Sequence, residues 1–135
     1  MNLSDKNKNL SNRTAPIEIH SGEFRKLGQK LVDEIAEFLD GLPQRPVATG
    51  ESPQALRKLL QPDILPESGS PASDLLDETT KLLFDHSLFN GHPRFWGYIT
   101  SSAAPIGALA DLLSAAVNPN TGAAVLSPIA SEIEA

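Results

Sequence analysis

The chain has 135 residues, 40% of them hydrophobic, and its 11 Lys and Arg against 17 Asp and Glu give a formal net charge of −6. This balance argues against a nucleic-acid partner, because phosphate contacts require clustered positive charge. The absence of cysteine excludes a disulfide framework and a thiolate metal site, and it favours a reducing, cytoplasmic location. The length allows one domain.

Residues 1–20 are polar and lack the apolar run of a signal peptide, so they are expected to form a disordered leader. The most apolar stretch lies much later, at residues 103–117. It is interrupted by Pro105 and Asp111 and is shorter than the ~20 residues that span a bilayer. We therefore expect a buried helix of a soluble protein at this stretch, and no membrane partner.

Residues 21–41 show the clearest helical pattern in the chain. Ser21 can cap the first turn, Gly41 suits the position just after the last turn, and Pro43 prevents continuation. Gly28, in the middle, indicates either close approach of another backbone or a local defect. The apolar positions recur at intervals of three and four and predict one buried face: Phe24, Leu27, Leu31, Ile35, Phe38 and Leu39.

The next segment, residues 42–73, is rich in proline and permits only short helices. Ser52 as cap and Pro53 as first residue predict a helix that ends near Leu60. The whole proline-rich segment is expected to lie on the surface of a larger structure and not to form a core of its own. Helical spacing returns at residues 74–89, before Gly91 and Pro93. The residues predicted to share one face of this helix are Leu75, Leu76, Thr79, Leu82, Leu83 and His86.

Residues 92–102 read HPRFWGYITSS and concentrate aromatic side chains within four positions. Phe95, Trp96 and Tyr98, together with the hydroxyls that follow, could line one wall of a site for an aromatic or planar ligand. The alternative is a hydrophobic plug between helices. Sequence spacing leaves both interpretations open.

Beyond this loop, Ser101 or Ser102 can cap a small-residue helix over residues 105–117. Turn chemistry predicts a loop at residues 118–122. Ser127 and Pro128 then open a last helix, which reaches Ala135 after about two turns and is expected to lack its remainder.

Few residues carry independent signs of catalysis. The three histidines, at positions 20, 86 and 92, lie apart and do not form a metal-ligand set. His92 suits either packing and capping or catalysis. No phosphate-binding glycine loop and no nucleophile elbow is present, and no lysine follows Lys81.

Five blocks in the same order resemble the N-terminal part of the group II pyridoxal-phosphate-dependent decarboxylases, the aromatic-L-amino-acid decarboxylase family. Together they cover the chain from about Gly22 to its end. The blocks are Phe24, Arg25, Gly28, Val32 and Asp33; Leu42 with Arg45, Pro46 and Val47; HPRFWGYITSS from His92; Ala110 to Leu113 with Asn118 to Asn120; and Ser127 and Pro128 with Glu132 and Glu134.

The resemblance implies a mainly α chain. Residues 21–90 would form a helical dimerisation arm that wraps over the partner of a homodimer. Residues 91–135 would hold the substrate-loop segment and the first helices of the large domain of a fold type I enzyme, truncated before its α/β core.

The resemblance also implies a carboxy-lyase of amino acid metabolism that uses pyridoxal 5′-phosphate and acts on an aromatic L-amino acid. Ala124 departs from the family, which usually has an aromatic residue there. The implied substrate-binding residues are Tyr98, Thr100 and Ser101, with Phe95 and Trp96 as apolar support, and with Asn120 and Gly122 in a loop that reaches the partner's site.

No catalytic, cofactor-binding or metal-binding residue is expected within these 135 residues, because the family's Schiff-base lysine and its other cofactor ligands correspond to later positions. We therefore expect an N-terminal fragment that is inactive by itself. The alternative is a non-catalytic helical dimerisation or interaction module derived from such an enzyme.

Overall fold

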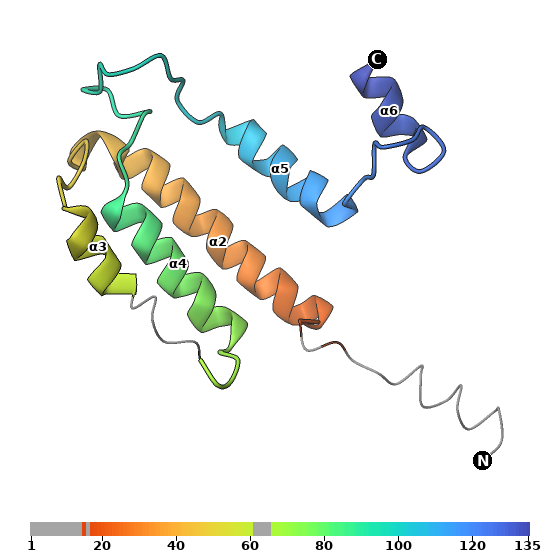
Figure 1. Ribbon diagram of the computed structural model, residues 1–135, viewed down its shortest axis with the longest axis horizontal. Helices are drawn as coiled ribbons and strands as arrows, with labels where there is room; N and C mark the ends of the chain where they lie inside the picture. The colour runs from red at the N-terminus through yellow and green to blue at the C-terminus, as the bar shows by residue number, and fades with distance from the viewer. Residues whose placement is uncertain (1–14, 16, 61–65) are drawn as a thin grey trace. The chain divides into compact units, whose positions relative to one another are not determined.

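The structure, a computed structural model, describes residue 15 and residues 17–60 and 66–135, and within these ranges it is helical without strands. The mainly α class is confirmed for this part of the chain. Helices α2, α3 and α4 belong to one compact unit (Figure 1), whereas Leu42–Gly50 and Ser87–Ala135 belong to a second. Most of the predicted leader, residues 1–14, lies outside the described residues.

Helix α2 spans Ser21–Gly41, as the spacing of its apolar residues predicts. Ser21 is its first helical residue and not its cap, because the Phe24 amide donates to the carbonyl of His20. Phe24 is the exception on the predicted face, with 54% of its surface exposed. The other predicted positions are half-buried: Leu27, Leu31, Ile35, Phe38 and Leu39.

The chain leaves α2 through a short 3-10 helix, η1, at Leu42–Gln44, which contains Pro43. Helix α3 follows at Pro53–Leu60. The Ser52 hydroxyl accepts a hydrogen bond from the Ala55 amide at 3.2 Å, and this confirms the predicted cap.

Helix α4 spans Ala72–His86, so it begins two residues before and ends three residues before the predicted range of 74–89. The early start has a clear cause. The carbonyl of Pro71 accepts hydrogen bonds from the amides of Asp74 and Leu75, which places Pro71 at the cap. At the other end, the Phe89 amide bonds to the carbonyl of Val47 and does not extend the helix.

The predicted apolar face of α4 is partly wrong. Of the six predicted positions, three are half-buried (Leu76, Leu82 and His86) and three are exposed (Leu75, Thr79 and Leu83). Thr80 and Phe84, which were not predicted, are also half-buried and follow Leu76 at intervals of four. Phe84 stacks on Phe38 of α2 with ring centroids 4.2 Å apart and planes 10° apart. The packed face of α4 is therefore rotated by about one residue from the expected one.

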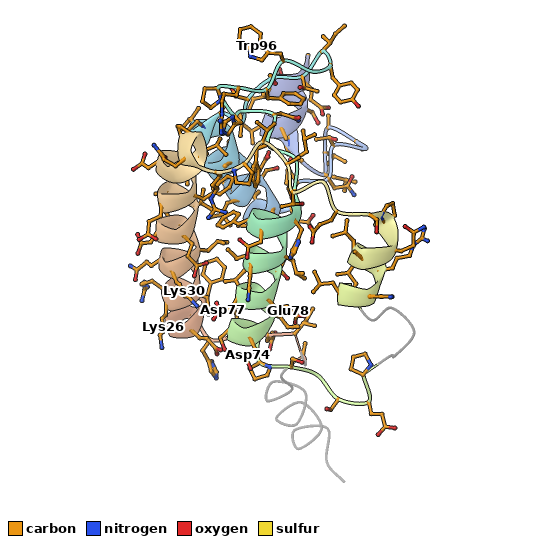
Figure 2. The ribbon with its side chains drawn as sticks, turned by 90° about the vertical axis from the view of Figure 1, so that its left-hand side faces the viewer. Lys26, Lys30, Asp74, Asp77, Glu78 and Trp96 are labelled. Carbon is orange, nitrogen blue, oxygen red and sulfur yellow. The ribbon has the colours of Figure 1, made fainter. Side chains whose placement is uncertain are left out.

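Helices α2 and α4 run parallel. Lys30 of α2 bonds to Asp77 of α4, and eight residues further along α2, Phe38 meets Phe84. Figure 2 shows Lys30 and Asp77 facing each other across the two helices. In chain order α3 comes between α2 and α4, and Nδ1 of His86 lies 2.6 Å from Oε2 of Glu51, just before α3.

The second unit contains helix α5 at Pro105–Val117 and helix α6 at Pro128–Glu134. Both helices were predicted, and so was the cap position of α6, whereas the cap of α5 differs from expectation. Ala104, and neither Ser101 nor Ser102, holds the cap position of α5; Ser127 holds that of α6, although its hydroxyl makes no capping bond.

The expectation of a buried helix over residues 103–117 is not met, because the structure leaves no residue of α5 buried. Its apolar side chains are exposed at helical spacing, at Ile106, Leu109, Leu112, Leu113 and Val117. Within the described part of the chain, no helix combines the length and apolar character that crossing a membrane requires.

Candidate functional site

The best-packed point of the described chain lies in the second unit, where two distant segments meet. Leu42, Phe89 and His92 are the buried side chains there, with 8%, 9% and 2% of their surfaces exposed. The Phe89 amide donates to the carbonyl of Val47 at 3.0 Å. We call Leu42, Arg45, Val47, Phe89 and His92 the loop anchor.

His92 uses both of its ring nitrogens inside this anchor. Nδ1 accepts a hydrogen bond from the Arg94 amide at 3.0 Å, and Nε2 lies 3.0 Å from the carbonyl oxygen of Arg45. Both nitrogens are thus occupied by backbone groups. The packing and capping interpretation of His92 is confirmed, and the ring is not available to a reacting group.

Residues 92–101 leave the anchor and return to it. A Cβ added at Gly91 would lie 3.2 Å from the Cβ of Ser102 and 3.6 Å from Cδ2 of Leu42. The two ends of the loop therefore touch, and the space between them accommodates glycine. This closure fixes where the loop begins and ends.

The aromatic loop, residues 95–101, projects its tip away from the anchor. Phe95 is half-buried, and a Cβ at Gly97 would lie 3.1 Å from its ring. The rings of Phe95 and Tyr98 are 6.3 Å apart and tilted by 37°. Trp96 is 92% exposed and labelled in Figure 2, and Tyr98 is 86% exposed. Both rings are therefore accessible in the described residues, and the choice between a ligand wall and a plug stays a prediction.

Tyr98 also has an unusual backbone. Its φ of 57° lies in the left-handed region, which side chains with a Cβ avoid. Thr100 and Ser101, two and three residues later, are exposed, so the structure brings the three predicted substrate-binding residues onto one accessible loop. Non-glycine residues in the left-handed region cluster at functional sites, which makes Tyr98 a candidate functional residue.

The other predicted site residues lie in the turn after α5. The amide of Gly122 donates to Oδ1 of Asn120 at 3.0 Å, and a Cβ at Gly122 would come within 3.1 Å of the same oxygen. Asn118 closes α5 with a φ of 48°. The predicted turn is confirmed, and both Asn120 and Gly122 are exposed.

Sequence reasoning missed two features of this region. The first is the carbonyl of Arg45, which accepts from His92 and, at 3.4 Å, from Nη2 of Arg94. A backbone acceptor leaves no signal in residue type. The second is the contact between Gly91 and Ser102. A glycine and a serine eleven residues apart give no sign in the sequence that they touch.

The described residues do not by themselves fit pyridoxal phosphate. Their lysines are on α2, α3 and α4, and the second unit, which carries the aromatic loop, contains none. The hydrogen bond that Lys30 donates to Asp77 raises the pKa of Lys30, which keeps its amine protonated and unsuited to attack on an aldehyde. The same residues include no group of three or more His, Asp or Glu side chains able to hold a metal.

Comparison with known proteins gives several relatives. The mouse aromatic-L-amino-acid decarboxylase is 31% identical over 114 residues, which are 84% of this chain and 24% of the relative. The rice tyrosine decarboxylase is 35% identical over 120 residues, 86% of this chain and 22% of the relative. The petunia phenylacetaldehyde synthase is 30% identical over 112 residues, which are 83% of this chain and 22% of the relative.

The chain spans about a quarter of the length of these relatives. No family model and no solved structure matches it. The three relatives nevertheless cover the same large share of the chain at similar identity. The resemblance in its sequence is thereby confirmed: the chain matches an N-terminal portion of a group II decarboxylase.

Proposed function

We propose that this chain is the substrate-loop portion of a cytoplasmic, homodimeric, pyridoxal-phosphate-dependent carboxy-lyase that acts on an aromatic L-amino acid. The observation that carries the proposal is Tyr98, an exposed aromatic residue with left-handed backbone on a loop whose two ends are fixed. The names of the relatives support the substrate class.

In this proposal the loop binds one side of the substrate. Tyr98 and the half-buried ring of Phe95 offer apolar surface to an aromatic side chain, and Trp96 extends it. The hydroxyls of Thr100 and Ser101 are free to donate hydrogen bonds to the substrate carboxylate. Asn120 and Gly122 form a hydrogen-bonded turn that we propose to lie at the active site of the partner subunit.

The cofactor ligands are proposed to lie outside the described residues, because these residues do not fit pyridoxal phosphate by themselves. Held by residues elsewhere in the enzyme, the cofactor would supply the electron withdrawal that decarboxylation requires. The contribution of this chain is to bind and orient the amino acid. The two roles can therefore be tested separately.

A chimeric decarboxylase provides the test. The chain replaces the matching segment of the rice tyrosine decarboxylase, and release of carbon dioxide, amine and aldehyde is measured with aromatic amino acids. The amine and the aldehyde are both measured because one relative is named as an aldehyde synthase. We expect the chimera to release carbon dioxide.

The variants Tyr98→Ala and Ser101→Ala should each raise the KM of the chimera about tenfold, the effect of one lost contact of about 1.4 kcal/mol. Thr79→Ala, at an exposed position of α4, is the matched control and should leave KM unchanged. A chimera that binds cofactor and dimerises, yet responds to none of the loop variants, would disprove the proposed substrate site.

One observation favours a second candidate function, a non-catalytic interaction module. Helix α5 exposes Ile106, Leu109, Leu113 and Val117 along one face, and apolar surface of this kind marks interfaces or aggregation. Light scattering of the purified chain, with Leu113→Glu as the variant, tests this candidate. A monodisperse monomer that is unaffected by the substitution would count against it.

A further inference from the structure

His92 is the most deeply buried polar side chain among the described residues, with 2% of its surface exposed. Its hydrogen bonds indicate which ring nitrogen carries a hydrogen. Because Nδ1 accepts from the Arg94 amide, it carries no hydrogen, and Nε2 must carry the hydrogen that it donates to the carbonyl of Arg45. The ring is therefore neutral, with each nitrogen committed to one backbone group.

These two hydrogen bonds join residues at different separations along the chain. The bond to Arg94 spans two residues and shapes the turn at Pro93. The bond to Arg45 spans 47 residues and ties the start of the loop to the segment after η1. We expect loss of the first bond to alter local geometry, and loss of the second to weaken the attachment of the loop to the anchor.

Two other groups join the same segments. The Phe89 amide bonds to the carbonyl of Val47, three residues before His92 and outside the loop itself. Arg94 also donates to the carbonyl of Arg45, but at 3.4 Å and from an exposed side chain. The His92 bond is shorter and shielded from water, so it carries more of the attachment.

We infer that His92 is a positioning residue, whose Nε2–H bond to the Arg45 carbonyl holds the aromatic loop in place and thereby presents Tyr98, Thr100 and Ser101 to a substrate. The attachment stands on geometry alone. Its consequence for substrate binding rests on the proposed function.

Two substitutions separate the bonds of His92. The amide nitrogen of His92→Gln can replace Nε2 and keep the bond to Arg45, whereas the shorter His92→Asn can keep the local bond to Arg94 and loses the bond to Arg45. Trp96 is the single tryptophan of the chain and lies in the loop, so its fluorescence anisotropy reports loop motion.

In the 135-residue chain, we expect His92→Asn to lower the anisotropy of Trp96 and His92→Gln to keep it near the wild-type value, with equal far-ultraviolet circular dichroism. His20→Asn, at an exposed histidine before α2, is the control. If the Gln and Asn variants of His92 behave alike, whether both are rigid or both are mobile, the inference is wrong.

The chimeric decarboxylase tests the consequence. His92→Asn should raise KM about tenfold with kcat unchanged, the pattern of lost substrate binding, and His92→Gln should restore it. If anisotropy separates the two variants but KM does not, the attachment stands and the proposed substrate-binding function of the loop is wrong. If neither separates them, His92 does not position the loop.

Discussion

Tyr98 shows how a single residue can link local structure to function. A residue with a Cβ at a φ of 57° is less stable by about 1–2 kcal/mol than in a right-handed conformation. Because 86% of Tyr98 is exposed, packing does not offset this penalty. A side chain that is strained and exposed is explained better by what it contacts in a complex than by stability.

Substitutions at Tyr98 should separate backbone strain from side-chain function. Tyr98→Gly relieves the strain, whereas Tyr98→Ala retains it, so the glycine variant should be more stable by about 1 kcal/mol. Urea unfolding of the two variants measures the difference. Both should weaken substrate binding in the chimera, and an alanine variant as stable as the glycine variant would contradict the argument.

At the scale of helices, α2 and α4 are joined by a stacked aromatic pair and by charge. The hydrogen bond of Lys30 to Asp77, with Glu34 at 3.6 Å, raises the pKa of Lys30 from its ordinary value of 10.5. The apolar face of α2 was predictable, since it follows the helical period. The partner and rotation of α4 were not, because its leucines occur on more than one face.

Alkaline pH should weaken the pairing of α2 and α4. Since the pKa of Lys30 is raised by folding, its stabilisation is complete below a pH of 10.5 and is lost as the pH rises through the raised value. Urea midpoints at about pH 9 and about pH 12 should therefore differ more for wild type than for Lys30→Met. Lys58→Met on α3 is the control and should retain the full pH dependence of wild type.

Gly28 allows the two interpretations of its role in α2 to be distinguished. A Cβ at this position would meet nothing within 4 Å, so Gly28→Ala should stabilise the isolated chain by about 0.5–1 kcal/mol through helix propensity. Thermal unfolding measures this gain, and Gly22→Ala at the first turn is the comparison. If Gly28→Ala also weakens the dimer of the chimera, another chain packs closely at this position; if it is neutral there, the glycine is a local defect.

At the scale of the whole molecule, the chain spans about a quarter of each relative, and its described residues carry the aromatic loop but do not by themselves fit pyridoxal phosphate. The aromatic loop and the turn at Asn120 and Gly122 are held by their own anchors and turn bonds. The apolar face of α5 is exposed. If the proposed function holds, substrate contact and cofactor chemistry lie in different parts of the enzyme.

This division predicts that the 135-residue chain, supplied with pyridoxal phosphate and an aromatic amino acid, releases no carbon dioxide. The physical reason is the lack of any lysine in the unit that carries the loop, together with the ion pair that occupies Lys30. The chimeric decarboxylase under the same assay is the positive control. Carbon dioxide release by the chain above the cofactor-only background would refute the prediction.

Several local features of this protein could be predicted from its sequence alone. The bounds of α2, the Ser52 cap of α3, the Pro128 start of α6 and the turn after Asn118 depend on side chains near each other in the chain, and so they were predictable. The family followed from ordered blocks of residues. Which face of α4 packs, why α4 ends at His86, and how His92 reaches Arg45 depend on contacts between distant segments. Only tertiary structure decided these features, because a backbone carbonyl and the rotation of a helix have no signature in residue type.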